Sequence, residues 1–98
     1  MNKNVKELIE YSKGGVVSKV ILKESWKNVT LFSMFKGTNI SEHTSTRKGM
    51  IYVIEGDGIF NLEGKDIEMT PGIFIFMKEN AVHSLKAKEN TSFLLILC

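Results

Sequence analysis

The sequence predicts an all-β protein with a short helix at its N-terminus, and three observations support this fold class. Seven short segments rich in β-branched and aromatic residues follow residue 15, at 16–23, 28–35, 50–55, 58–63, 73–77, 81–87 and 92–97. Turn sequences that contain glycine separate them, and the only proline, Pro71, lies in one of these turns. No helical pattern interrupts the series, which favours an antiparallel sandwich or barrel.

The N-terminal segment is the only part with a helical pattern. Val5, Leu8 and Ile9 form one apolar stripe, and Asn4 is a suitable N-terminal cap. We expect the helix to continue to about Lys13, because two glycines follow it. The chain is then one domain over residues 1–98, with a helix and lead-in at 1–15 and a β-barrel at 16–98.

Composition excludes several classes of function. The chain has 98 residues, 43% of them hydrophobic and 24% charged, with a net charge of +2. This weak and scattered positive charge disfavours nucleic-acid binding, and no apolar run is long enough for a transmembrane helix or a signal sequence. The single cysteine, Cys98, cannot form an internal disulfide, so we expect a cytoplasmic protein that acts on neither nucleic acid nor membrane.

Two predicted strands, at 73–77 and 93–97, are apolar on both faces. A strand with one face in water alternates between apolar and polar residues, so the outer faces of these two need a cover. A homodimer would supply it, and burial between two sheets of one chain is the alternative. Candidates for the interior are methionine and aromatic residues, namely Phe32, Met34, Met50, Phe60, Met69, Phe74, Phe76, Met77 and Trp26.

Both histidines of the chain lie in glycine-framed stretches. The first stretch contains Gly37, His43, Ser45, Gly49 and Gly56 at intervals of 6, 2, 4 and 7 residues. Side chains two residues apart on a strand point the same way, so His43 and Ser45 are expected on one face.

The second stretch contains Gly72, Lys78, Asn80, His83 and Ala87. The two stretches together resemble the two-motif signature of the cupin superfamily, whose patterns are G-x5-H-x-H-x3-E-x6-G and G-x5-P-x-G-x2-H-x3-N. The resemblance implies a double-stranded β-helix, or jelly-roll barrel. Asn80 stands where the family has glycine, and asparagine tolerates the same left-handed backbone conformation.

The resemblance also implies a metal site, but one with an incomplete ligand set. In the family, three histidines and one glutamate hold a divalent metal such as iron, manganese, nickel or zinc. Here His43 and His83 remain, while Ser45 and Gly49 replace one histidine and the glutamate. A catalytic zinc site normally has three protein ligands. Residues that could complete the set are Glu42, Tyr52 and Met77, of which Glu42 would face the other side of a regular strand.

The pocket predicted from the residues combines the same histidines with two hydroxyl groups. His83 shares its strand face with Leu85 and an alanine, which belong in the interior, so His83 is expected to point inward. A buried Tyr52 would need a hydrogen-bond partner. We therefore expect a ligand pocket of His43, Ser45, Tyr52 and His83, and no residue is assigned a catalytic role.

These observations favour a small-molecule binding or sensing protein. An apolar pocket with a few polar groups suits that role, and the pattern contains no nucleophile with a base and an orienting acid. Arg47, after a run of hydroxyl residues, could clamp an anion or simply face solvent. The alternatives are a metal-dependent enzyme of dioxygenase, isomerase or decarboxylase type, and a structural dimer with a vestigial pocket.

Overall fold

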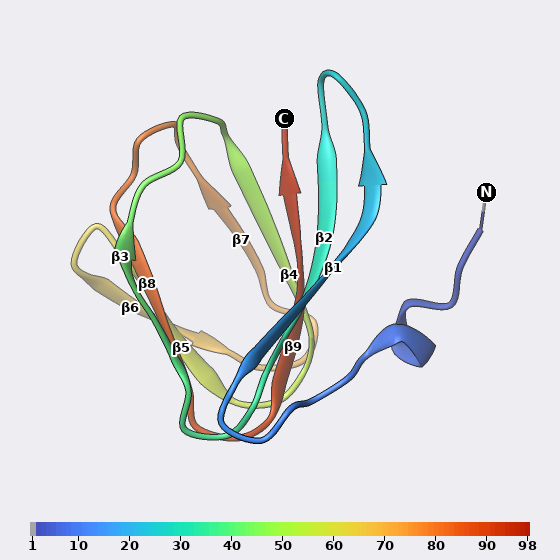
Figure 1. Cartoon of the computed structure of the whole chain (residues 1–98). Helices are drawn as coiled ribbons and strands as arrows, with labels where there is room; N and C mark the ends of the chain where they lie inside the picture. The colour runs from blue at the N-terminus through green and yellow to red at the C-terminus, as the bar shows by residue number, and fades with distance from the viewer. Residues whose placement is uncertain (1) are drawn as a thin grey trace.

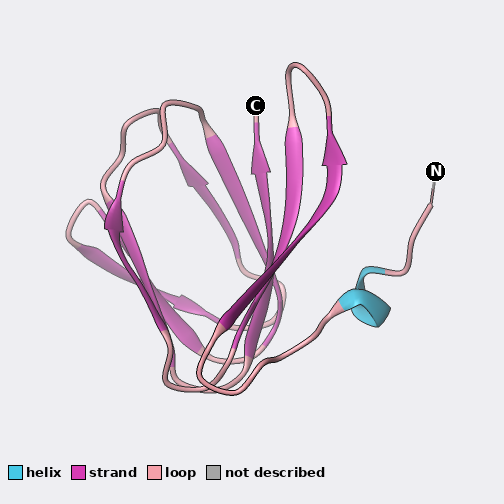
Figure 2. Ribbon diagram, viewed as in Figure 1, coloured by secondary structure: helices cyan, strands magenta, loops and turns pink. Residues whose placement is uncertain are grey.

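The computed structural model describes residues 2–98, in which nine strands form two facing antiparallel sheets (Figures 1 and 2). The strands are β1 (Val16–Lys23), β2 (Asn28–Met34), β3 (Asn39–His43), β4 (Gly49–Glu55), β5 (Gly58–Leu62), β6 (Lys65–Met69), β7 (Phe74–Met77), β8 (His83–Ala87) and β9 (Thr91–Leu97). The predicted fold class is therefore confirmed. No helix within residues 2–98 is long and apolar enough to cross a membrane.

The two sheets exchange strands along the chain. One sheet has the order β1-β2-β9-β4-β7, and the other has the order β3-β8-β5-β6. The chain passes from one sheet to the other after β2, β3, β4, β6, β7 and β8, which gives the jelly-roll arrangement visible in Figure 1. The two histidine motifs meet because β3 and β8, far apart in the sequence, are neighbouring strands of the four-stranded sheet.

The N-terminal helix is present but shorter than expected. It is a single 3-10 turn, η1 (Val5–Leu8), capped by the Asn4 side chain, and Ile9 is already extended. The segment that follows runs along the five-stranded sheet. Tyr11 donates a hydrogen bond to Glu55 at 2.8 Å, and its hydroxyl lies 2.6 Å from that of Ser92. These tertiary contacts hold the segment extended, since an isolated helix of this length is only marginally stable.

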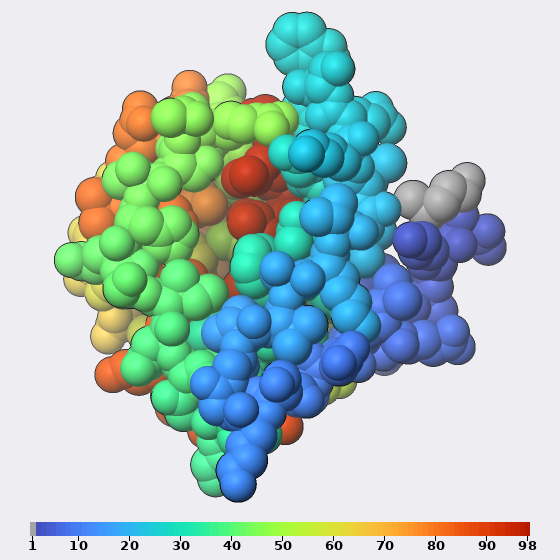
Figure 3. All heavy atoms as spheres, in the orientation of Figure 1, coloured from blue at the N-terminus to red at the C-terminus, as the bar shows by residue number. Residues whose placement is uncertain are grey.

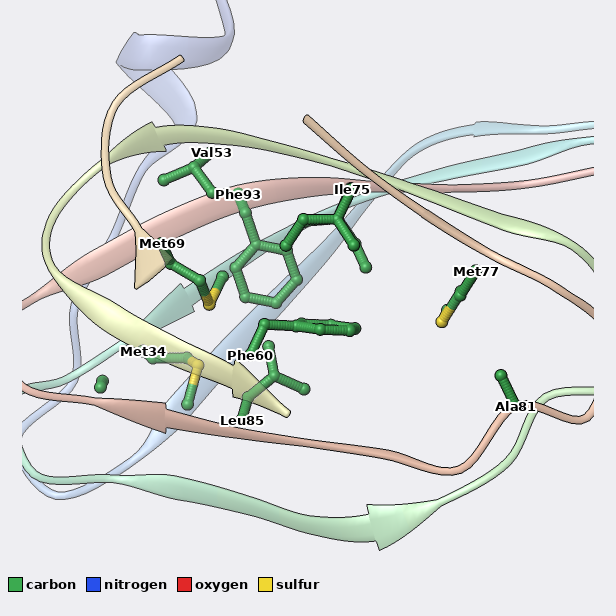
Figure 4. Close-up of a cluster of buried hydrophobic side chains, with 11 residues drawn as sticks. Met34, Val53, Phe60, Met69, Ile75, Met77, Ala81, Leu85 and Phe93 are labelled. Atoms are coloured by element: carbon green, nitrogen blue, oxygen red, sulfur yellow. The ribbon is translucent and has the colours of Figure 1, made fainter. Parts of the chain in front are cut away.

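The core lies between the two sheets. Figure 4 shows its side chains converging from both of them, with Phe60 near the centre. The fully or nearly buried members are Met34, Ile51, Val53, Phe60, Met69, Ile75, Met77, Ala81, Leu85, Ala87 and Phe93. Alternation along β8 places His83 inward with Leu85 and Ala87, as the sequence predicted.

Three residues expected in the interior lie outside it. Trp26 is 85% exposed between β1 and β2, while Phe74 and Phe76 are 54% and 53% exposed. Ile75 and Met77 are the inward residues of β7, so alternation turns the two phenylalanines outward. The outer face of β7 is therefore only about half covered by residues 2–98.

Candidate functional site

His43 and His83 face each other across the β3–β8 pair. Between the paired residues Ile40–Leu85 and His43–His83, β3 advances by three residues while β8 advances by two. The extra residue makes a bulge, which re-aims the side chains beyond it. Without the bulge, Ile40 and His43 would point to opposite faces, and with it both line the same cavity.

The backbone fixes the orientation of both imidazole rings. His43 Nδ1 lies 2.8 Å from the carbonyl oxygen of Ser41, and His83 Nδ1 lies 2.9 Å from that of Ala81. A carbonyl oxygen only accepts, so Nδ1 carries the proton in each neutral ring and Nε2 carries a lone pair. The two ring centroids are 4.0 Å apart with a tilt of 60°. Both rings therefore offer an electron-pair donor to the same region.

Phe60 packs against the imidazole ring of His83. Its ring stacks on that of His83, with centroids 5.7 Å apart and planes within 9° of parallel. Phe60 is 0% exposed, so it can move little. This contact follows from the β5–β8 pairing, in which Leu62 is opposite His83 and Phe60 is opposite Leu85.

His43 and His83 line a largely apolar cavity of about 80 Å³ between the two sheets. Every strand except β1 and β6 contributes to its wall. The lining residues are Phe32, Ile40, His43, Ile51, Phe60, Met77, His83, Leu85, Phe93 and Leu95. Figure 3 shows the molecule hollowed between β3 and the β1–β2 hairpin, with atoms of β9 in red at the floor. His43 is exposed and His83 is buried, so the pair lies between solvent and the interior.

Burial lowers the pKa of the His83 imidazole below its ordinary value. The hydrogen bond with the Ala81 carbonyl oxygen acts in the opposite direction, and the nearby His43 lowers the pKa further. Burial therefore favours the neutral form of the His83 imidazole. A neutral ring can accept a hydrogen bond or ligate a metal through Nε2.

Ser45 and Arg47 belong to the loop after β3 rather than to the cavity wall. The Ser45 carbonyl oxygen accepts a 2.7 Å hydrogen bond from the backbone N–H of Asn80, and its hydroxyl accepts one from Arg47 N. The Arg47 side chain donates to the carbonyl oxygen of Leu97 at 3.4 Å. The expected left-handed conformation of Asn80 is confirmed, with φ of 63°. These contacts join the loops that carry the two motifs.

Tyr52 and Glu42, two of the residues considered as further ligands, point away from the cavity. Tyr52 is 46% exposed on the outer face of the five-stranded sheet, because Ile51 and Val53 are the inward residues of β4. Tyr52 therefore does not line the cavity, contrary to the prediction from the sequence. Glu42 lines a groove of about 450 Å³ on the outer face of the other sheet. The bulge that brings His43 inward leaves Glu42 outside.

Met77 is the third of those residues, and it does line the cavity beside the histidines. It is the direct cross-strand partner of Gly49. A Cβ atom at position 49 would lie 2.5 Å from Met77 Cε and 3.1 Å from Cγ. Met77 therefore occupies the space that any side chain at position 49 would enter. This contact could not be predicted from the sequence, because it depends on the register in which β4 pairs with β7.

The ligand set that the cupin pattern implies does not fit this site. Within residues 2–98, no three histidine, cysteine, aspartate or glutamate side chains come together in a group that could hold a metal ion. Iron and manganese sites of this type use a carboxylate beside imidazoles. Gly49 offers no carboxylate, and the Ser45 hydroxyl is engaged in the loop.

Comparisons with known proteins agree with this architecture. The family model described as "Cupin domain" matches residues 30–98. No curated protein matches the sequence.

Several solved structures share the fold. An RmlC-like cupin protein from Desulfovibrio desulfuricans is 18% identical, with 100% of this chain and 95% of that chain covered and a TM-score of 0.90. The SPY1581 protein of unknown function from Streptococcus pyogenes is 21% identical, with coverages of 99% and 85% and a TM-score of 0.89. A cupin 2 conserved barrel domain protein from Leptotrichia buccalis is 28% identical at a TM-score of 0.90, and 97% of this chain covers 46% of it.

Proposed function

The chain belongs to the cupin family, and on that premise we propose that it binds a small ligand in the cavity between its two sheets. The observation that carries this proposal is the pair of imidazoles in the wall of an otherwise apolar cavity. Sites for small molecules combine mostly apolar walls with a few polar groups that fix the orientation of the ligand.

The size of the cavity limits the ligand. Its volume of about 80 Å³ is well below the roughly 300–1,000 Å³ of pockets for drug-sized molecules. A ligand that fits without rearrangement has only a few non-hydrogen atoms. The walls include the soft side chain of Met77, which adapts to irregular shapes and borders a second cleft beside Phe76 and Ala81. A shift of this side chain would enlarge the space.

The histidines define the polar end of the ligand. Both Nδ1 atoms already donate to backbone carbonyl oxygens, so the two Nε2 atoms are left as acceptors. The matching ligand is a small neutral molecule with an N–H or O–H donor and an apolar body. The residues that line the cavity include no lysine or arginine, so the site does not favour an anionic ligand.

A titration followed by two-dimensional NMR tests this proposal. Pyrazole and short alcohols are suitable probes, since each has one donor and a small apolar body. We expect shifts confined to the cavity residues, His43, His83 and Phe60 among them. A His43→Ala, His83→Ala double variant is the control and should lose the response. Shifts scattered over the surface, or unchanged binding in the double variant, would contradict the proposal.

A metal-dependent enzyme is the alternative, supported by the hydrogen bonds that hold both rings through Nδ1. Histidines that ligate metals almost always donate their other N–H to such a partner. Metal analysis by mass spectrometry of the untagged protein, beside the same double variant, separates the two functions. Near-stoichiometric metal that disappears in the variant would favour the enzyme.

We also propose that two copies of the chain associate through the outer face of the five-stranded sheet. Tyr52 and Phe74 are cross-strand partners there, Phe76 lies on the same face, and all three are about half exposed. The N-terminal segment covers one end of this face through Tyr11 and leaves the aromatic end uncovered. A two-fold dimer would bring the same apolar patch of each copy together.

A further inference from the structure

We propose that the cavity is also a binding site for a monovalent copper ion, held by His43 Nε2, His83 Nε2 and the thioether sulfur of Met77. The inference uses the same cavity as the proposed function but does not require an organic ligand. It departs from the site that the cupin pattern implies, because the donors and the metal both differ.

The first support is that the backbone already orients the two imidazole nitrogen donors. The hydrogen bonds of 2.8 and 2.9 Å from Nδ1 to backbone carbonyl oxygens fix each ring and leave the Nε2 lone pair free. Within residues 2–98, every buried side-chain nitrogen or oxygen atom that is sealed from solvent has a hydrogen-bond partner. His83 Nε2 has no hydrogen-bond partner in this part of the chain, so it must be open to the cavity.

The second support is the position of Met77. Its Cε and Cγ atoms lie 2.5 and 3.1 Å from where a Cβ at position 49 would be, so the methionine side chain fills the space beside Gly49. In the cupin pattern that position carries the glutamate ligand. Figure 4 shows Met77 at one end of the core, on the side of Ala81 and separated from the other two labelled methionines. A thioether side chain thus fills the space that a side chain at position 49 would enter, and it lines the same cavity as the two histidines.

The third support is the chemistry of the complete donor set. Glu42 and Tyr52 face outward, so the cavity offers two imidazoles and one thioether, with no negative charge. Thioether sulfur is a soft ligand that selects monovalent copper, whereas carboxylates and waters suit magnesium and manganese. An uncharged set also favours a singly charged ion, since the apolar walls penalise any charge that remains uncompensated.

Anaerobic titration with monovalent copper against a chromophoric copper chelator tests the inference. The exposed thiol of Cys98 would compete for copper, so all variants carry Cys98→Ser. Met77→Leu keeps the volume and removes the sulfur, and Met69→Leu makes the same change at a core methionine outside the cavity wall. We expect one copper per chain and an affinity lowered at least about tenfold by Met77→Leu, a loss that even outer-shell changes cause. Met69→Leu should leave the affinity unchanged.

X-ray absorption provides a readout that a merely structural role would not affect. The spectrum of the copper-loaded protein should contain a sulfur scatterer, and Met77→Leu should remove it. Absence of one-to-one binding, equal affinity in the two leucine variants, or displacement of copper by equimolar zinc would overturn the inference. If monovalent copper does not bind while pyrazole binding still depends on the histidines, the copper site alone is refuted. If both fail, the proposed function is refuted too.

Discussion

The turn between β4 and β5 provides the sharpest test of how the two sheets are joined. Gly56 lies in this turn with φ of 112°, a conformation that side chains other than glycine rarely adopt. A Cβ atom there would lie 2.5 Å from both Cα and Oγ1 of Thr91, at the start of β9. Gly56→Ala therefore introduces strain into the backbone and a collision with a second strand.

The size of the effect follows from those two contributions. An unfavourable backbone conformation costs about 1–3 kcal/mol. The collision displaces Thr91, which is 0% exposed and whose hydroxyl bonds to the backbone of Asp57 and Glu89. Each lost hydrogen bond costs about 0.5–1.5 kcal/mol. We expect Gly56→Ala to lower the free energy of unfolding by about 3–5 kcal/mol in total.

Gly64→Ala is the matched control for this variant. Gly64 also has a positive φ, 84°, but no atom lies within 4 Å of the position of its missing Cβ. Only the conformational cost of about 1–2 kcal/mol applies. Urea unfolding followed by circular dichroism measures both, and it is preferable to fluorescence because Trp26 is 85% exposed. Equal destabilisation of the two variants would refute the close approach of the β4–β5 turn to β9.

Three further predictions concern the site and the surfaces around it. In metal-free protein, the lowered pKa of His83 means that the unfolded chain takes up a proton first as pH falls through about 6.5. The free energy of unfolding should therefore decrease below that pH, by at most about 1.4 kcal/mol per pH unit, and His83→Gln should flatten this slope. Tyr11→Phe removes the hydrogen bond to Glu55 and should cost about 1 kcal/mol in urea unfolding, while an unchanged midpoint would mean that the segment is not anchored there. If the chain forms the proposed dimer, Phe74→Asp should shift it to a monomer in sedimentation at micromolar concentration, whereas the same change at exposed Val20, on β1, should not. An unchanged sedimentation coefficient for Phe74→Asp would contradict the proposed interface.

The fold was predictable because several independent patterns in the sequence agree with it. The strands, the glycine turns and the spacing of the two motifs all require the same barrel, and Asn80 even adopts the left-handed conformation of the glycine it replaces. The inward position of His83 followed from Leu85 and Ala87 alone, because alternation along a single strand needs no tertiary information.

The rest of the site depended on features that the sequence does not determine. Both faces of β4 are largely apolar, so nothing indicated whether Tyr52 or Ile51 points inward. No residue type in β3 signals a bulge, although the bulge decides that His43 rather than Glu42 enters the cavity. The N-terminal helix ends early because Tyr11 binds the sheet, a contact made across more than forty residues of sequence.

The loss of the family's glutamate is best understood together with Met77. Gly49 and Met77 are direct cross-strand partners, and a side chain at position 49 could enter only if the methionine withdrew. Glycine at one position and methionine at the other are thus sterically matched. A site that had merely lost its function would be free to fill with any apolar side chain. In the proposed copper site, Met77 adds an electron-pair donor to the cavity wall that also contains two imidazoles oriented by the backbone. That combination favours a site whose ligand has changed over one that has been abandoned.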